Sequence, residues 1–410
     1  MTAAATSLTG APSSAKTWTS INWKSIEAQV YRLQMRIAKA TREGRQGKVK
    51  ALQWLLTHSF NAKLFAVKRV VQNRGGKTPG VDNIIWKTAT QKIQAALSLT
   101  RKSYRPQPLK RIYIPKKDGR KRPLSIPTMK CRAMQALHLL ALEPVTETRA
   151  DKNSYGFRPK RSAADAIEKC FKSLGRSCSA QWILEGDIKS CFDKISHEWL
   201  RNNIPMDKEI LQKWLEAGYI DKGTLHQRFE GTPQGALISP ALLIATLSGL
   251  EDTVMKAAPK HSKVHLCVYA DDFIITGESK ELLEDIVKPV VECFLRERGL
   301  ELSQTKTKIT HINDGFNFLG FNIRKYKGKL IIKPAKESIK SLLGNIRRTI
   351  KKNCTSTTLE LIRQLNPKIR GWVYYYRFVV ASRDFAFIDS CIFKSLWQWV
   401  KRRHTSKGAR

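Results

Sequence analysis

The sequence predicts a mixed α+β fold in which helices at both ends of the chain flank short antiparallel strands. Apolar residues recur at helical spacing over residues 22–44 and again over residues 335–352. Between these ends, residues 109–127 and 264–277 have the alternation and the central turn of β-hairpins. At 410 residues, 42% of them apolar, the chain is long enough for two or three compact units with sizeable cores.

The N-terminal part is predicted to be helical after a small and polar leader. One face of the first helix carries four apolar residues, Ile26, Val30, Leu33 and Ile37. A second helix is expected over VKALQWLLTHSFNAKLFAVKRVV, residues 49–71. Basic residues on both helices would suit a nucleic-acid cradle, although a plain solvated face would look similar. The glycine and proline loop NRGGKTPGVDN follows, so we expect a first domain over residues 1–75.

The middle of the chain places carboxylates at the ends of predicted strands. In QWILEGDIKSCFDKISHEWL a strand leads to Asp187, and a helix is expected to begin near Ser196, a favourable N-cap residue. In VHLCVYADDFIITG a strand leads to Asp271 and Asp272, and a second strand follows. Asp187 precedes Asp271 by 84 residues, so only a tertiary fold would bring them together.

Three carboxylates at strand ends would suit divalent cations. Because no His or Cys ligand set accompanies them, hard oxygen ligands favour Mg²⁺ over zinc. Two such ions about 4 Å apart would lower the barrier to in-line nucleotidyl displacement. Adjacent carboxylates repel one another when unpaired, and a bound dication reverses the sign of the local field. Taken alone, Asp271 and Asp272 are more simply an ordinary polar turn.

The charge of the chain points to a polyanionic partner. Lys and Arg outnumber Asp and Glu by 74 to 34, which gives a formal net charge of +40. Residues 321–410 alone hold 22 Lys and Arg against four Asp and Glu. Nucleic acid is therefore the leading candidate, and this tail the main electrostatic contact, because a merely solvated surface usually mixes both signs.

The predicted hairpin at residues 109–127 has a strongly cationic tip, KKDGRK. Lys116 and Arg122 there would hold an incoming triphosphate, the arginine by bidentate geometry and the lysine as a point charge. A solvated turn is an equally good explanation of this tip taken alone.

Neither a secretory signal nor a membrane span is expected. The first twenty residues lack an apolar core, and the uncharged stretch 231–250 contains two prolines and three glycines, which favour a loop and a buried helix. The eight cysteines show no CxxC pair and no zinc spacing. We therefore expect a soluble intracellular protein with reduced cysteines.

The order of these motifs resembles that of the reverse transcriptases encoded by group II introns. The series consists of IPKKDGRKRPLSIP, NSYGFRPKRSAADAI, GDIKSCFD, GTPQGALISP, YADD, GLELSQTKTK and FNFLGF. Downstream, LNPKIRGWVYYYR is similar to the maturase signature of the same family. The resemblance extends over roughly residues 20–405 and includes nearly the whole chain.

The resemblance implies a right-hand polymerase fold. Fingers and palm with an antiparallel sheet would span residues 76–330, and an all-helical thumb that doubles as the maturase domain would span residues 331–410. The tyrosines and tryptophan of GWVYYY would stack on bases or, for most of them, pack the thumb helices. An endonuclease domain, which many relatives carry past the thumb, is not expected in this chain.

The resemblance also assigns roles to single residues. Asp187 and Asp271 would bind the two metal ions, with Asp272 as the third carboxylate of the palm. Lys116 and Arg122 would grip the triphosphate of a dNTP, and Gln234 and Gly235 would line the nucleotide and template.

Four further residues are assigned roles, and three of them have competing explanations. Phe192 matches a steric gate against the ribose 2′-OH, but a core aromatic would also fit. Lys306 matches a lysine that assists pyrophosphate departure, or is a surface lysine. Arg158 would touch the template or form a structural salt bridge. Tyr269 would shape the acidic turn near nucleic acid.

The implied function is an RNA-directed DNA polymerase that binds its group II intron RNA as a ribonucleoprotein, assists splicing and copies the RNA into DNA during retrohoming. Its other partners would be dNTPs and a DNA target or primer, with no membrane contact and with the oligomeric state left open. Basic thumb residues would contact nucleic acid: Lys336, Lys340, Arg347, Arg348, Lys351 and Arg370.

Two alternatives remain: a related enzyme used in phage defence or beside CRISPR, and a splicing-only maturase. The expected location is the bacterial cytoplasm, with nucleoid association during mobility, and an organellar origin stays open. Two motifs depart from the common pattern, because the chain has QGA and LSIP where many relatives have QGG and LGIP. Neither change removes a charged or metal-binding group, so modest effects on rate are expected.

Overall fold

The computed structural model describes residues 15–115, 119 and 121–403, and it divides the chain into two compact units. The first unit comprises the described residues up to Pro159, together with Ile188–Thr253 and Val291–Leu302. The second unit comprises Lys160–Asp187, Val254–Val290 and the described residues from Ser303 onward. The expected domain boundaries after residues 75 and 330 stay predictions.

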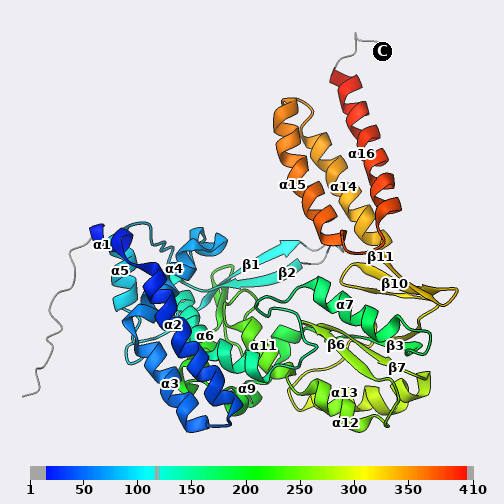
Figure 1. The fold of residues 1–410 in the computed structure, drawn as a ribbon. Coiled ribbons are helices and arrows are strands. Elements are labelled where there is room, and N and C mark those ends of the chain that lie inside the picture. The colour runs from blue at the N-terminus through cyan, green and yellow to red at the C-terminus, as the bar shows by residue number, and fades with distance from the viewer. Residues whose placement is uncertain (1–14, 116–118, 120, 404–410) are drawn as a thin grey trace, which may run out of the picture. The chain divides into compact units, whose positions relative to one another are not determined.

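Helices form most of the first unit (Figure 1). Its N-terminal helices are α1 (Ala15–Ser20), α2 (Trp23–Arg42), α3 (Gln46–His58), α4 (Phe60–Gln72) and α5 (Ala89–Leu97), with the 3₁₀ turn η1 (Arg74–Lys77) before α5. The long α6 (Met129–Arg149) packs against α2, α3 and α4. The same unit contains α8 (Cys191–Lys194), α9 (His197–Asn203), α10 (Lys208–Glu216) and α11 (Ser239–Leu247).

Two sequence expectations about these helices have different outcomes. Ser196 caps α9 as predicted, since its hydroxyl accepts a hydrogen bond from the Trp199 N–H. The single helix expected over residues 49–71 is wrong, because Ser59 has an extended backbone (φ −65°, ψ 127°) that separates α3 from α4. The apolar periodicity continues across this break and so did not reveal it.

The sheet of the first unit contains the predicted cationic hairpin. Strand β1 (Leu109–Pro115) pairs antiparallel with β2 (Lys121–Ile126), with Pro115 opposite Lys121. On its other side β1 pairs in parallel with β4 (Tyr219–Asp221), which continues antiparallel to β5 (Thr224–His226). Lys116 lies outside the described residues, whereas Arg122 is exposed on β2 opposite Ile114.

A neutral histidine lies in the core of the first unit. The ring of His138 on α6 is buried and meets the Trp214 ring edge-on at 5.5 Å, and the Trp214 indole donates a hydrogen bond to the Tyr104 hydroxyl (2.8 Å). Burial lowers the pKa of His138 to about 4. Its protonation in the unfolded chain, where the pKa is about 6.5, therefore favours unfolding as the pH falls.

Replacing His138 with Leu is expected to remove part of the acid sensitivity of the fold. The contribution of His138 to the free energy of unfolding is constant above pH 6.5 and is lost as the pH falls from 6.5 towards 4. The loss amounts to about 2 kcal/mol between pH 7 and pH 4.5. Denaturant unfolding of the wild type and the variant at both pH values measures this difference. Parallel losses of stability in the two proteins would contradict it.

The second unit is built on an antiparallel sheet with the order β6-β7-β3-β8. Its strands are β3 (Trp182–Asp187), β6 (His265–Tyr269), β7 (Asp272–Gly277) and β8 (Lys308–His311). Helix α7 (Ala163–Leu174) packs against β6, and a π-helical turn (Leu282–Val287) leads into α13 (Lys288–Arg296). Two helices are divided between the units: α12 (Leu250–Ala257) begins in the first unit and ends in the second, and α13 begins in the second and ends in the first. The predicted hairpin at 264–277 is therefore confirmed.

A second sheet and three helices complete the second unit. Strands β9 (Phe316–Phe318), β10 (Phe321–Tyr326) and β11 (Lys329–Pro334) form an antiparallel sheet. Helices α14 (Lys336–Lys352), α15 (Thr358–Tyr376) and α16 (Ser382–Arg403) lie side by side in Figure 1 and share an apolar core that includes Ile346 and Trp399. We call these three helices the C-terminal bundle.

Tyrosines attach the C-terminal bundle to the sheet of β9–β11. The hydroxyls of Tyr375 and Tyr376 donate to the carbonyls of Leu319 and Gly320. The Phe321 ring lies 4.8 Å from that of Tyr376. Most aromatic residues of GWVYYY were expected to pack within the protein, and Tyr375 and Tyr376 do so. Tyr374, in contrast, is 64% exposed.

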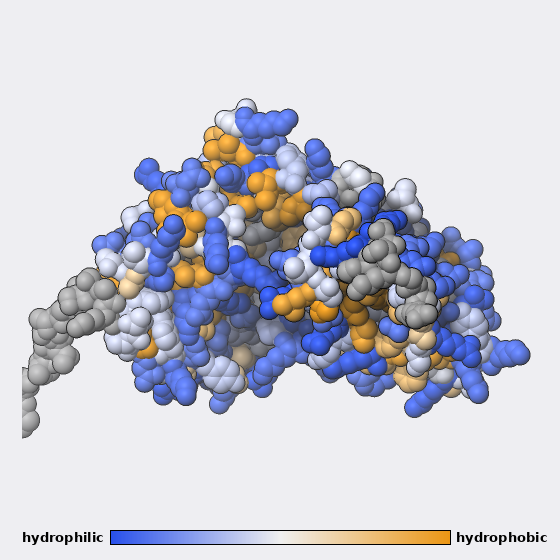
Figure 2. Space-filling view, turned by 90° about the horizontal axis from the view of Figure 1, so that it is seen from above, coloured by the Kyte–Doolittle hydropathy of each residue, from blue (hydrophilic) through white to orange (hydrophobic). Residues whose placement is uncertain are grey.

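Hydrophilic side chains predominate on the face shown in Figure 2, with separate hydrophobic patches between them. Within the described part of the chain, every helix is too short or too polar to cross a bilayer. All eight cysteines are described and none forms a disulfide.

Candidate functional site

Three carboxylates occupy one end of the β6-β7-β3-β8 sheet. Asp187 is the last residue of β3 and pairs across the sheet with Asp272, the first residue of β7. Asp271 lies in the turn between β6 and β7, where Ala270 adopts a positive φ of 60°. Tyr269 ends β6 opposite Asp272. The fold therefore brings Asp187 next to Asp271 and Asp272, as a common site formed by these strand ends requires.

Gly186 allows the two strands to approach at this end. A Cβ atom built on Gly186 would lie 2.2 Å from the Phe273 ring, which is 1% exposed. Gly186 was not singled out from the sequence, although its position directly before Asp187 is a usable signal, because a glycine inside a strand marks a close approach.

The pKa of one carboxylate, Asp272, is raised by its surroundings. Partial burial, followed by the negative charges of Asp271 and Asp187, raises the pKa of Asp272 to about 6. Lys306 opposes this rise. Crowded oxygen ligands of this kind are stabilised in their charged form by a cation.

Lys306 provides one positive charge at the site. Its Nζ lies 2.8 Å from Asp187 Oδ1, and the lysine side chain is 57% exposed while that of Asp187 is 18% exposed. The loop before β8 holds it there, since the Ser303 N–H donates to the Asp187 carbonyl (2.8 Å) and the Lys306 N–H donates to the Ser303 carbonyl (3.1 Å).

The donor set fits a hard divalent cation. Three carboxylates lie at this strand end, and the charges of Asp271 and Asp187 add to partial burial in raising the pKa of Asp272. Among the described residues, no three His, Cys, Asp or Glu side chains converge closely enough to form a metal site as they stand. The Asp187 carboxylate is instead paired with the Lys306 ammonium.

The expected nucleotide-contacting residues that are described, apart from Lys306, belong to the first unit. Gln234 is tied to its surroundings twice, because its Nε2 donates to Asp193 Oδ2 (2.8 Å) and its carbonyl accepts from the Ser125 N–H (2.8 Å). Gly235 has a φ of +103°, and a Cβ there would lie 2.9 Å from Leu124. The loop QGA and the strand segment LSIP, the two departures from the family pattern, are thus neighbours.

Two residues of this region were not singled out from the sequence. Asp193 orients Gln234, and its place in GDIKSCFD is the signal that would have identified it. Ser125 is fully buried and its hydroxyl has no hydrogen-bond partner.

Phe192 lies on α8 and is half-buried. Its ring meets the Phe157 ring edge-on at 6.0 Å, and its carbonyl accepts a hydrogen bond from the Thr232 N–H. The role of steric gate stays a prediction.

Arg158 forms the structural salt bridge that was the competing explanation, and its contact with a template stays a prediction. The residue is 8% exposed and its guanidinium forms a bidentate pair with the Glu147 carboxylate at 3.0–3.1 Å. Its Nη1 donates to the carbonyls of Asp151 and Ser154 (2.8 Å each). These contacts use the donors that a template phosphate would need.

Replacing Arg158 with Met is expected to lower the free energy of unfolding by about 2 kcal/mol, because Glu147 and two carbonyls lose their donor. Chemical denaturation measures the loss. The exposed Arg105 offers a matched control, since Arg105→Met removes the same charge from the surface. Equal stability of the two variants would show that the Glu147 pair contributes little.

The basic residues expected to contact nucleic acid are exposed on the C-terminal bundle. Five lie on α14 and one on α15: Lys336, Lys340, Arg347, Arg348, Lys351 and Arg370. Their exposure is compatible with binding a polyanion and does not by itself identify one.

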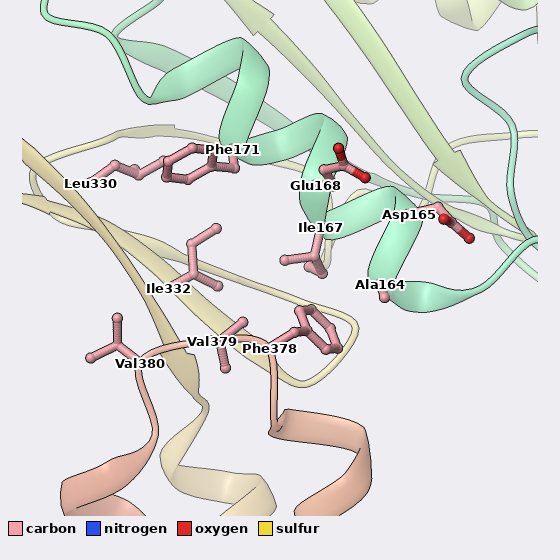
Figure 3. Close-up of a pocket in the computed structure, with 10 residues that line it drawn as sticks. All are labelled: Ala164, Asp165, Ile167, Glu168, Phe171, Leu330, Ile332, Phe378, Val379 and Val380. Atoms are coloured by element: carbon pink, nitrogen blue, oxygen red, sulfur yellow. The ribbon is translucent and has the colours of Figure 1, made fainter.

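A separate apolar pocket of about 480 Å³ lies between α7, β11 and the connection from α15 to α16. In Figure 3, Ile167, Ile332 and Phe378 point towards one another across it. The three catalytic candidates do not line it, so it is a different feature from the acidic site.

Comparison with known families covers most of the chain. Residues 114–323 match the family described as reverse transcriptase (RNA-dependent DNA polymerase). Residues 18–99 match the N-terminal domain of reverse transcriptase, and residues 339–410 match the group II intron maturase-specific domain. The chain belongs to the group II intron reverse transcriptase family. This membership confirms the resemblance and the fold class, and it supports the enzyme class.

Two relatives of this reverse transcriptase come from bacteria. It is 32% identical to Protein YkfC of Escherichia coli (strain K12), with 64% of this chain and 80% of that protein aligned. It is 27% identical to the group II intron-encoded protein LtrA of Lactococcus lactis subsp. cremoris, with 78% of this chain aligned to 62% of LtrA.

Among solved structures, telomerase from Candida tropicalis is similar, with a TM-score of 0.46 and 15% identity over 71% of this chain and 60% of that chain.

Proposed function

We propose that the protein is an RNA-directed DNA polymerase that extends a DNA primer with dNTPs on a group II intron RNA. The single observation that carries this proposal is the cross-strand pairing of Asp187 with Asp272 beside Asp271, in a chain of the reverse transcriptase family. A net charge of +40 supports a nucleic acid as template and primer.

The carboxylates of Asp187 and Asp271 would hold Mg²⁺, with Asp272 as the third acidic group. When bound, such ions activate the primer hydroxyl and stabilise the leaving oxygen of an in-line nucleotidyl transfer. The protein's own contribution is to fix the strand ends, because β3 and β7 pair in register up to the carboxylates. Arg122, Lys116 and Gln234 would orient the dNTP, and Phe192 would exclude a ribose.

We also propose that the C-terminal bundle binds the intron RNA and assists its splicing. The match to the maturase-specific domain and the exposed basic residues of α14 and α15 support this role. Affinity for the RNA would fall steeply with salt, since each neutralised phosphate releases counterions. We further propose a location in the bacterial cytoplasm, with association with the nucleoid during mobility; two of the relatives are bacterial proteins.

The identity of the RNA that copurifies with the full chain tests this function. A structured intron RNA, spliced faster in the presence of the protein and copied in the presence of Mg²⁺ and dNTPs, is the expected result. Splicing without copying would indicate a maturase that has lost polymerisation. Copying with unrelated cellular RNA would indicate a polymerase serving another purpose, such as defence.

A further inference from the structure

The ammonium group of Lys306 lies where a cation would bind the Asp187 carboxylate. The distance of 2.8 Å from Nζ to Oδ1 is that of a charge-assisted hydrogen bond. The neighbouring lysine on the same loop and strand, Lys308, pairs instead with Glu185 at 3.2 Å. The two lysines thus have similar exposure, 57% and 61%, and different carboxylate partners.

The backbone of the loop makes this pairing specific. Ser303 is hydrogen-bonded to the carbonyl of Asp187 itself, and both Lys306 and Thr307 donate their N–H groups to the Ser303 carbonyl. The turn is therefore anchored on the residue whose side chain Lys306 contacts. The lysine side chain is long and mostly exposed, so it is able to leave without moving the turn.

The Lys306 ammonium and a divalent cation compete for one oxygen atom. Asp272, across the sheet, feels the negative charges of both other carboxylates and, in the opposite sense, the positive charge of Lys306. Removing the ammonium would leave the Asp187 oxygen free to bind a metal ion. While the ammonium is in place, it lowers the apparent affinity of the site for the metal ion.

We propose that Lys306 is a placeholder cation, which pairs with Asp187 in the metal-free protein and is displaced when a divalent cation binds. This inference rests on the proposed function, because it takes Asp187 as a metal ligand. Displacement would free the ammonium for the part in pyrophosphate departure that the motif resemblance implies, and so would couple metal binding to the departure of pyrophosphate.

Mn²⁺ binding to the RNA-free full chain, measured by electron paramagnetic resonance, tests the proposal. The site is defined as the binding that Asp187→Asn abolishes. Lys306→Met is expected to tighten Mn²⁺ binding about fivefold, the equivalent of one exposed ion pair. The matched control Lys308→Met, which removes the same charge two residues away, should change the affinity by less than about twofold.

Chemical labelling of the wild type gives a second readout. Acetylation of Lys306, measured by peptide mass spectrometry, should increase about threefold when Mg²⁺ is added, because an amino group released from its hydrogen bond to Asp187 is more accessible to the reagent than a paired one. Lys308 in the same digest should be labelled equally in both conditions.

The outcomes separate this inference from the proposed function. Equal Mn²⁺ affinity of Lys306→Met and Lys308→Met, or metal-independent labelling of Lys306, would overturn the placeholder role while primer extension by the wild type persists. If the wild type neither bound Mn²⁺ at Asp187 nor extended a primer, both the inference and the proposed function would fail.

Discussion

Replacing Asp271 with Asn is expected to reduce primer extension on an RNA template by at least about a thousandfold. The substitution keeps the size of the side chain but removes the negative charge that would hold Mg²⁺ between the ends of β6 and β7. Single-turnover extension of a labelled DNA primer with saturating dNTPs and Mg²⁺ measures the chemical step. Binding of the RNA should persist, because the basic residues of the C-terminal bundle are unchanged.

Asp285→Asn is the matched control for this experiment. Asp285 is an exposed carboxylate of the same unit, on the π-helical turn, and its loss removes an equal charge away from the strand ends. It should extend the primer at the wild-type rate. Extension by Asp271→Asn within about tenfold of that rate would be incompatible with a metal-binding role for Asp271.

Gly186→Ala is expected to lower the free energy of unfolding by about 3 kcal/mol and to impair primer extension as well. The added methyl group would meet the buried ring of Phe273 at 2.2 Å, and Phe273 directly follows Asp272. Either the ring or the strand must shift, and both displace the carboxylates of Asp187 and Asp272 relative to one another. Denaturant unfolding and primer extension measure the two effects.

Gly344→Ala serves as the control for the glycine substitution. Gly344 lies within α14, where a Cβ would meet nothing within 4 Å, so alanine should raise stability by about 0.5–1 kcal/mol. The double variant Gly186→Ala with Phe273→Leu should regain part of the lost stability, because the smaller side chain makes room. Unchanged unfolding of Gly186→Ala would show that β3 and β7 are not packed as closely as the structure has them.

Much of the site could be predicted from the sequence because its signals are local. The alternation before Asp271 and the adjacent apolar run after Asp272 predicted β6 and β7, and both strands are present. The N-cap at Ser196 was likewise encoded within four residues. Motif order supplied the family, which the comparisons confirm.

Other features could not be predicted from the sequence, because apolar periodicity and charge do not reveal which partner a side chain meets or where a helix breaks. Arg158 has the positive charge expected of a residue that contacts the template, but its guanidinium donates to Glu147 and to two backbone carbonyls. The break at Ser59 leaves the apolar spacing of α3 and α4 intact, so no periodicity marked it. The pairing of Lys306 with Asp187 joins residues 119 positions apart.

The sequence by itself therefore determined the strands, the acidic turn, the basic C-terminal helices and the family, since each follows from residue patterns within one segment or from their order. The tertiary structure alone decided that Asp187 stands opposite Asp272 and that Lys306 neutralises it. The physical reason is that register between β3 and β7 is set by backbone hydrogen bonds and by the fit of Phe273 against Gly186, which no local periodicity encodes.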